Sequence, residues 1–297
     1  MDSIVRGYKT WLTLERGLSA HTVSAYLEDI SKFMTYMKLQ NRAIEWSQVS
    51  GEDLSKFLVY LHDLGLSSLS QTRIISGLRS FFSYLQTERI VTSDPSMLIE
   101  MPKTGRKLPE VLSVEEIDKM IACIDLSRPE GHRNKAIIET LYGCGLRVSE
   151  LVALRISNIY MNDGFLQVIG KGNKERIVPM SEHTLLSISQ YLMQRQSVYT
   201  VKKGYEDLLY LNRRGGKLSR QMIFMMIRQY ASLAGISKTI GPHTFRHSFA
   251  THLIDGGADL RAIQEMLGHA SITTTEIYTH LDRHFLRDTI IQYHPRS

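Results

Sequence analysis

Cysteine is nearly absent from this 297-residue sequence, which contains only Cys123 and Cys144. Two cysteines form neither a disulfide framework nor a zinc motif, and this scarcity is typical of a reducing compartment. No apolar stretch approaches the ~18 residues that a membrane-spanning helix needs, and the chain does not open with a charged segment followed by an apolar one. We therefore expect a cytoplasmic protein without a membrane partner.

The sequence also lacks a balance of charge. Its 36 Lys and Arg residues outnumber its 30 Asp and Glu residues, which gives a formal net charge of +6. Residues 1–104 contain 11 basic and 11 acidic residues, so the whole excess lies in the remainder of the chain. A basic half favours a polyanionic partner, although many basic proteins bind none.

The length and the apolar content of 43% are sufficient for two domains with separate cores. Residues 1–100 contain four segments with helical apolar spacing, at about 2–16, 19–37, 51–64 and 67–85, which predict a small helical bundle. Residues 101–109 are rich in Pro and basic residues, so we expect a linker that invites phosphate contact through Lys103, Arg106 and Lys107. The second domain would span residues 110–297.

This second domain is predicted to be mainly helical with a small β-sheet. Helices are expected at 113–126, 131–142, 181–200 and 219–234, with another that begins beside Arg147 and continues to Leu154. Residues 165–169 and 176–178 are typical of two strands joined by a Gly-rich turn. A further short strand is expected at 208–211.

Residues 242–280 bring several reactive side chains to successive helix ends. A helix begins at Pro242 and ends at Gly256 and Gly257, and it carries His243 and Arg246 on one face. A second helix runs from Asp259 to Leu267, and Gly268 places His269 just beyond its end. Ser271 or Thr273 would cap a third short helix that carries Tyr278. This arrangement is typical of an active site.

The chemistry of these groups favours phosphoryl transfer. A guanidinium group binds phosphate through two parallel hydrogen bonds, and imidazole can donate a hydrogen bond or move a proton. Tyrosine is a possible nucleophile, and cationic neighbours would help because ionising it at pH 7 costs about 4 kcal/mol. Without a carboxylate cluster, two-metal hydrolysis is poorly supported. Zinc at His243, His247 and His252 is disfavoured because Arg246 shares a face with His243, and His294 is expected at the surface.

Three motifs resemble those of the tyrosine recombinase (phage integrase) family. They are HTFRHSFATHL, then LGHASITTTEIYTH, and earlier GCGLRVSEL, which resembles the segment carrying the family's first arginine. The final YHPRS resembles the tail of one recombinase of the Xer type. The resemblance implies an N-terminal four-helix core-binding (SAM-like) domain and an α+β catalytic domain, together with site-specific DNA recombination without a cofactor or a metal.

The resemblance also implies the roles of individual residues. Tyr278 would attack the scissile phosphate and Lys171 would protonate the leaving 5′ oxygen. The phosphate would be held by Arg147, His243, Arg246 and His269. Apart from the resemblance, Glu150 lies three residues beyond Arg147 on the same helix face, so it is expected to orient the guanidinium. Lys174 and Arg176 are expected to contact phosphates or to be solvated turn residues. Gln71, Arg73 and Arg79 would face the DNA major groove, with an ordinary solvated surface as the alternative.

Partners follow from the same resemblance. The expected partners are double-stranded DNA, a XerC-like recombinase in a heterotetramer (or further copies in a self-tetramer) and an FtsK-like translocase. Together they would resolve chromosome dimers at a dif-type terminus site, and residues 283–293 would dock on a neighbouring subunit unless their apolar stripe is buried in their own domain. Two alternatives are an integrase of a mobile element and a non-cleaving DNA-binding protein on the same fold.

Overall fold

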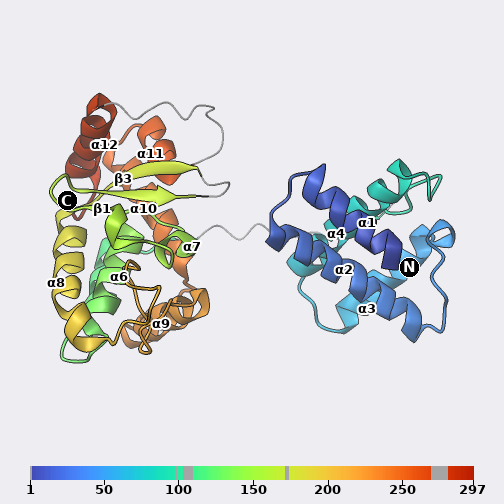
Figure 1. Cartoon of the computed structure of the whole chain (residues 1–297), viewed down its shortest axis with the longest axis horizontal. Helices are drawn as coiled ribbons and strands as arrows, with labels where there is room; N and C mark the ends of the chain where they lie inside the picture. The colour runs from blue at the N-terminus through green and yellow to red at the C-terminus, as the bar shows by residue number, and fades with distance from the viewer. Residues whose placement is uncertain (1, 98, 103–109, 171–173, 269–279) are drawn as a thin grey trace. The chain divides into compact units, whose positions relative to one another are not determined.

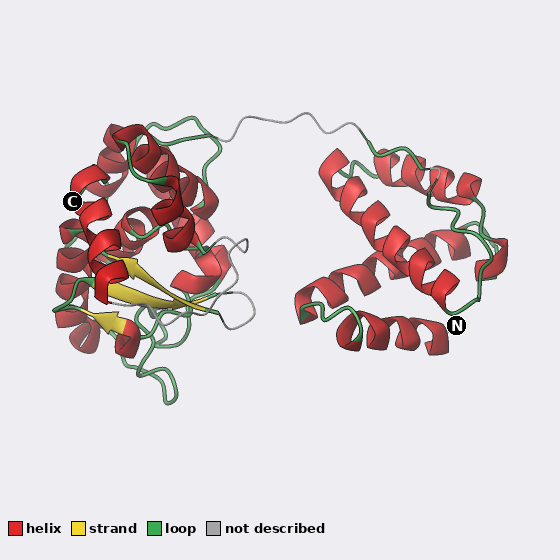
Figure 2. Ribbon diagram, turned by 90° about the horizontal axis from the view of Figure 1, so that it is seen from above, coloured by secondary structure: helices red, strands yellow, loops and turns green. Residues whose placement is uncertain are grey.

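The computed structural model describes residues 2–97, 99–102, 110–170, 174–268 and 280–297. The chain divides into two compact units, Met1–Lys107 and Leu108–Ser297 (Figure 1). Most of the predicted linker, residues 103–109, lies outside the described residues. Helices dominate both units, and the strands of the second unit form one small sheet (Figure 2). The predicted fold class is therefore confirmed.

The described residues of the first unit form four helices. They are α1 (Asp2–Leu14), α2 (Ala20–Leu39), α3 (Gly51–Asp63) and α4 (Ser68–Thr87), with a single 3₁₀ turn at Trp46–Gln48. A serine side chain caps the N-terminus of each of the last three helices, at Ser19, Ser50 and Ser67. The core is rich in stacked and edge-on aromatic rings, among them Phe33 with Phe57 and Trp46 with Phe81.

The second unit combines helices with a three-stranded sheet. They are α5 (Val114–Ala122), α6 (Gly131–Gly143), α7 (Val148–Leu151), α8 (Glu182–Val198), α9 (Arg220–Leu233), α10 (Pro242–Gly256), α11 (Leu260–Leu267) and α12 (His280–Tyr293), with a 3₁₀ turn at Ile156–Asn158. Strands β1 (Ile159–Tyr160), β2 (Phe165–Ile169) and β3 (Glu175–Pro179) are antiparallel in the order β1-β2-β3. Helices α11 and α12 pack against β3, on the same side of the sheet in Figure 1.

Some local predictions differ from the structure. Helix α7 ends at Leu151 rather than at Leu154, and residues 208–211 form only isolated bridges, Arg155 with Leu208 and Leu211 with Lys217. His294, expected at the surface, is only 3% exposed, because it packs beneath Tyr142 and Phe249. The burial of His294 depends on contacts with segments distant in the sequence, which a local pattern does not show.

Helix α12 buries part of its apolar stripe in its own unit. Leu286 and Ile290 are each 1% exposed and belong to the core of the second unit, whereas Phe285 and Ile291 are at least half exposed.

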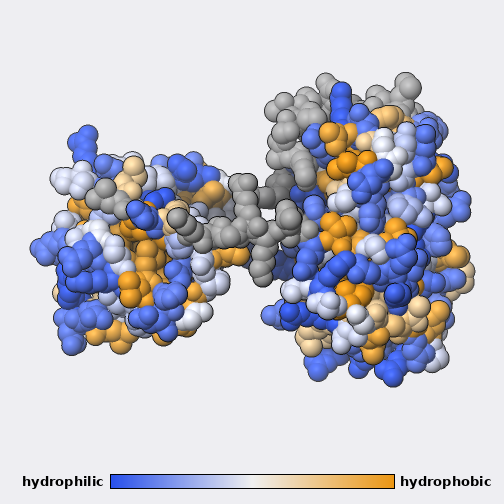
Figure 3. Space-filling model, turned by 180° about the vertical axis from the view of Figure 1, so that it is seen from behind, coloured by the Kyte–Doolittle hydropathy of each residue, from blue (hydrophilic) through white to orange (hydrophobic). Residues whose placement is uncertain are grey.

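On the face shown in Figure 3, hydrophobic side chains form patches separated by hydrophilic ones. In the part of the chain that the structure describes, no helix has the length and hydropathy needed to span a bilayer.

Candidate active site

A glycine turn places the first arginine of the site. Helix α6 ends at Gly143, and Gly145 has a φ of +57°, in the left-handed region that favours glycine. A β-carbon at Gly145 would lie 2.5 Å from Cδ1 of Phe249, so the turn also needs the space that glycine leaves. The chain then reaches Arg147, which is the N-cap residue of α7.

Glu150 holds Arg147 from one turn further along α7. The Arg147 backbone N–H donates to Oε2 of Glu150 at 2.8 Å, and its Nη1 donates to Oε1 at 2.9 Å. Longer bonds run from the guanidinium to the carbonyl oxygens of Leu267 at 3.4 Å and Gly268 at 3.5 Å. The Arg147 side chain is 35% exposed, so it remains open to a ligand from solvent.

Arg246, on α10, also binds the carbonyl oxygen of Leu267. It donates from Nη1 to the carbonyl of Gly145 at 2.8 Å and from Nη2 to the carbonyl of Leu267 at 2.5 Å. Burial, and then the positive charges of Arg147 and Arg176, lowers the pKa of Arg246 to about 10. The guanidinium is still charged at neutral pH. The structure thus brings Arg147 and Arg246, far apart in the sequence, to one point.

Arg176 occupies a different place from the one expected. It is 5% exposed and donates from both Nη atoms to the Glu150 carboxylate, at 2.9 and 2.8 Å, and from Nε to the carbonyl of Met266 at 2.7 Å. This corrects the expectation of a phosphate contact or a solvated turn residue. Arg176 pairs with Val168 across the sheet and shares a face with Val178, both of which are buried. The alternation along β3 is the signal that identifies it. Lys174, by contrast, is exposed.

Glu150 is therefore the hydrogen-bond acceptor that Arg147 and Arg176 share. Together with Arg246, these residues form a cluster. It is 6% exposed and accepts four hydrogen bonds from two arginines, two on each oxygen. Burial is the largest influence on its pKa and would raise it. The bonds and charge of Arg176, followed by the bonds from Arg147, outweigh burial and hold the pKa of Glu150 below its ordinary value.

His243 lies exposed on the first turn of α10, which begins at Pro242. It precedes Arg246 by three positions, on the same helix. Three further predicted site residues, Lys171, His269 and Tyr278, lie outside the described residues. Gly170 directly precedes the first of these, and Gly268, the C-cap of α11, directly precedes the second.

The described part of this site can bind an anion such as a phosphate. The Glu150 carboxylate binds the guanidinium groups of Arg147 and Arg176 and interacts through charge with a third, that of Arg246, so the cluster has a formal excess of positive charge. Among the described residues, no three His, Cys, Asp or Glu side chains lie close enough together to hold a metal ion.

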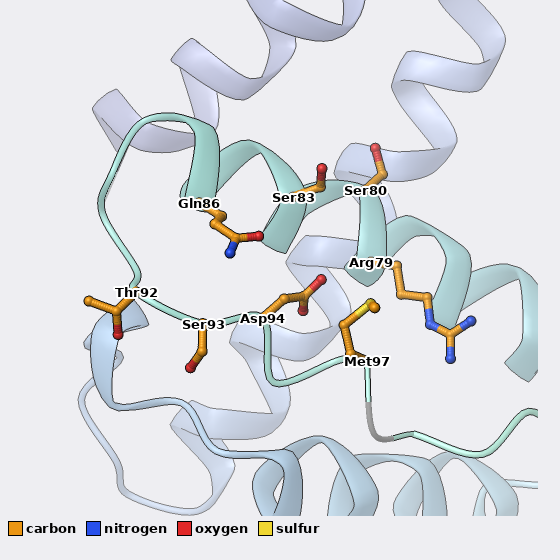
Figure 4. A pocket seen from close by; sticks show the side chains of 8 residues that line it. All are labelled: Arg79, Ser80, Ser83, Gln86, Thr92, Ser93, Asp94 and Met97. Atoms are coloured by element: carbon orange, nitrogen blue, oxygen red, sulfur yellow. The ribbon is translucent and has the colours of Figure 1, made fainter.

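The predicted DNA contacts of the first unit have partners within that unit. Gln71 is 6% exposed and donates to the carbonyl of Leu66 at 2.8 Å, which corrects the expectation that it faces a DNA groove. Arg79 donates to the carbonyls of Ser96 at 3.3 Å and Ile99 at 2.8 Å, at the edge of the hollow shown in Figure 4. Arg73 pairs with Asp29 at 2.7 Å, but its side chain is 45% exposed. Lys103, Arg106 and Lys107 lie outside the described residues.

Comparisons with known proteins place the chain in a family. Residues 5–89 match the phage integrase N-terminal SAM-like domain, and residues 110–284 match the phage integrase family. The chain therefore belongs to the phage integrase family, whose members are the tyrosine recombinases.

Individual relatives narrow the class to the Xer type. The chain is 42% identical over 297 residues to the tyrosine recombinase XerD of Oceanobacillus iheyensis, covering 100% of both chains, and 40% identical over 297 residues to XerD of Listeria monocytogenes, again covering 100% of both. XerD is also the recombinase whose tail YHPRS resembles. Among solved structures, XerH in a post-cleavage complex with palindromic difH has a TM-score of 0.70 at 28% identity, covering 92% of this chain and 80% of that chain. The chain is a Xer-type tyrosine recombinase, a site-specific DNA recombinase.

Proposed function

We propose that Tyr278 cuts one DNA strand by forming a 3′-phosphotyrosyl bond. Its phenolate oxygen, formed when the phenolic proton passes to solvent, bonds to phosphorus as the bond from phosphorus to the 5′ oxygen breaks, and Lys171 gives a proton to that leaving oxygen. Arg147, His243, Arg246 and His269 hold the phosphate meanwhile. A 5′ hydroxyl from another strand reverses the step, so the phosphodiester is restored without ATP or a metal.

The observation that carries this proposal is the convergence of Arg147 and Arg246 on the Leu267 carbonyl, at 3.4 and 2.5 Å. Two charged guanidinium groups at one point are suited to the non-bridging oxygens of a phosphodiester. Leu267 is followed at once by Gly268 and His269, so the point lies beside the motif that leads to Tyr278 in the sequence.

The substrate that we propose is a dif-type site at the replication terminus, in the cytoplasm. There the chain would act with a XerC-like recombinase in a heterotetramer, controlled by an FtsK-like translocase, to resolve chromosome dimers before cell division. Support comes from the XerD relatives, which match this chain over its whole length, and from the XerH relative, whose complex contains difH. Residues 283–293 are proposed to contact a neighbouring subunit through the exposed side of α12, which carries Phe285 and Ile291.

The test is to capture covalent protein–DNA adducts from cells under denaturing conditions and to sequence the attached ends. A Tyr278→Phe variant is the matched control, because it lacks only the phenolic oxygen. We expect one Tyr278-dependent peak near the replication terminus. Peaks at the ends of a mobile element would instead make the chain an integrase, and occupancy of DNA without any Tyr278-dependent adduct would refute the cleavage mechanism.

A further inference from the structure

Arg176 links the parts of the active site that arise from different elements. It lies on β3, its partner Glu150 is on α7, and Met266 is near the end of α11. We propose that Arg176 is a positioning residue for strand cleavage, which fixes the guanidinium of Arg147 through Glu150 without touching DNA. This inference rests on the proposed cleavage function.

The first step of the argument concerns how Arg147 is held. Among the described residues, the shortest hydrogen bond of its guanidinium is the 2.9 Å bond from Nη1 to Glu150, and those to the carbonyl oxygens of Leu267 and Gly268 are 3.4 and 3.5 Å. The direction of that short bond depends on how the plane of the Glu150 carboxylate is oriented. Arg176 binds both oxygens of the same carboxylate, which fixes its plane; without Arg176, Glu150 would keep only the two bonds from Arg147, the residue that has to be oriented. Arg147 therefore depends on Arg176 for its orientation.

The second step concerns the backbone around Arg176. A β-carbon at Gly268 would lie 2.9 Å from Cδ of Arg176, so the end of α11 rests directly on this side chain. A β-carbon at Gly170, at the end of β2, would lie 3.7 Å from its Nη1 and 3.8 Å from Oε1 of Glu150. The residues that follow these two glycines are His269 and Lys171. The buried Arg176 side chain therefore occupies the space that an added β-carbon would approach at either glycine.

The third step concerns charge. Three guanidinium groups and the Glu150 carboxylate give the cluster a formal charge of two positive units. Attack of a phenolate on a phosphodiester forms a pentacoordinate phosphorus with two negative charges, which this cluster balances. Without Arg176 the cluster would carry one positive unit. Arg176 therefore supplies charge as well as geometry, although it is buried.

The variants separate positioning from DNA contact and from general stability. Arg176→Lys keeps the charge but cannot bind both carboxylate oxygens in one plane. Arg176→Gln keeps a planar donor group without the charge, and it serves if the lysine variant does not fold. Arg195→Lys is the matched control, because Arg195 is also 5% exposed in this unit but donates to backbone carbonyls of residues 205–209.

The experiment uses full-length protein and a nicked DNA duplex that contains the site recovered by adduct capture. The unfolding temperature, the Kd for DNA and the rate of covalent adduct formation at saturating protein are measured where each variant is folded. We expect Arg176→Lys to bind DNA with an unchanged Kd and to form the adduct about 10- to 100-fold more slowly, as for other residues that orient a reactive group. Arg195→Lys should lose stability while keeping its rate.

Three results would overturn the inference. They are a wild-type cleavage rate in both Arg176 variants, a loss of rate that parallels a loss of DNA affinity, and an equal loss of rate in Arg195→Lys. Tyr278→Phe is run beside them. If wild-type protein forms no Tyr278-dependent adduct, the proposed function falls and this inference falls with it; if it forms one and the Arg176 variants match it, only the inference falls.

Discussion

At the scale of single residues, His294 shows how burial changes the chemistry of a side chain near the end of the chain. Its ring centroid lies 4.8 Å from that of Tyr142, and its Nδ1 accepts a bond from the backbone N–H of Arg296 at 3.2 Å. The neutral ring therefore carries its hydrogen on Nε2. Burial, and then the charges of His252 and Arg296, lowers the pKa of His294 to about 3.

The first prediction follows from this pKa. Between the ordinary value of 6.5 and about 3, the unfolded chain binds a proton at His294 that the folded chain does not. The free energy of unfolding therefore falls as the pH falls through this range, by at most about 1.4 kcal/mol per pH unit from this residue. His294→Gln should remove the contribution of this residue to the pH dependence. The free energies of unfolding measured in urea for the wild type and the variant should therefore diverge between about pH 7 and pH 5. His284→Asn, at an exposed imidazole of α12, is the control, and parallel curves for wild type and His294→Gln would contradict the assignment.

Single residues also show what the sequence could not reveal. The spacing of Arg147 and Glu150 predicts their contact because both lie within one turn of helix. The burial of Arg176 depends on Val168, Glu150 and Met266, which are distant in the sequence. A basic residue beside a Gly-rich turn is ordinarily solvated, and only the alternation along β3 indicates that Arg176 faces the buried side of the sheet. Gln71 and His294 were misplaced for the same reason.

At the scale of elements, caps, breaks and the hairpin of β2 and β3 were predictable, whereas contacts between elements distant in the sequence were not. Ser113 and Glu116 form the expected capping box at α5, and Asp259 and Gly268 bound α11 as expected, because these signals act within a few residues. Strand β1 was not predicted, since its two residues are too few to show alternation. Its existence depends on pairing with β2.

The turn at Gly145 gives the second prediction. Gly145→Ala should destabilise the protein by at least about 1 kcal/mol from the left-handed conformation alone, and further through the contact with Phe249. Gly164→Ala is a matched control, because Gly164 has a φ of +74° but its nearest neighbour to an added β-carbon is 3.9 Å away. Urea unfolding should show the larger loss at Gly145, and adduct formation should slow only there, because Arg147 follows two residues later. Equal effects at both glycines would mean that Phe249 does not constrain the turn.

At the scale of the whole molecule, the distribution of charge matters more than its sum. The excess of +6 lies beyond residue 104, although the first unit is also expected to contact DNA. Each phosphate contact contributes about −0.9 to the slope of log affinity against log salt concentration. That slope therefore reports the number of phosphate contacts that both units make together. Replacing one exposed cation that contacts a phosphate should make the slope shallower by the share of that contact.

These phosphate contacts can be counted with one exposed residue from each unit, Arg73 in the first and Lys174 in the second. If both units bind the same DNA duplex, Lys174→Gln and Arg73→Gln should each make the slope shallower by about 0.9, and the double variant by about twice that. Glutamine at position 73 can still donate to Asp29, so the buried carboxylate keeps a partner. Arg176→Gln is the internal control, because a buried arginine bonded to Glu150 should leave the slope unchanged even where cleavage is slowed. A slope that responds to Lys174 but not to Arg73 would show that this face of the first unit does not contact DNA, and a slope that responds to Arg176 would make that residue a phosphate contact after all.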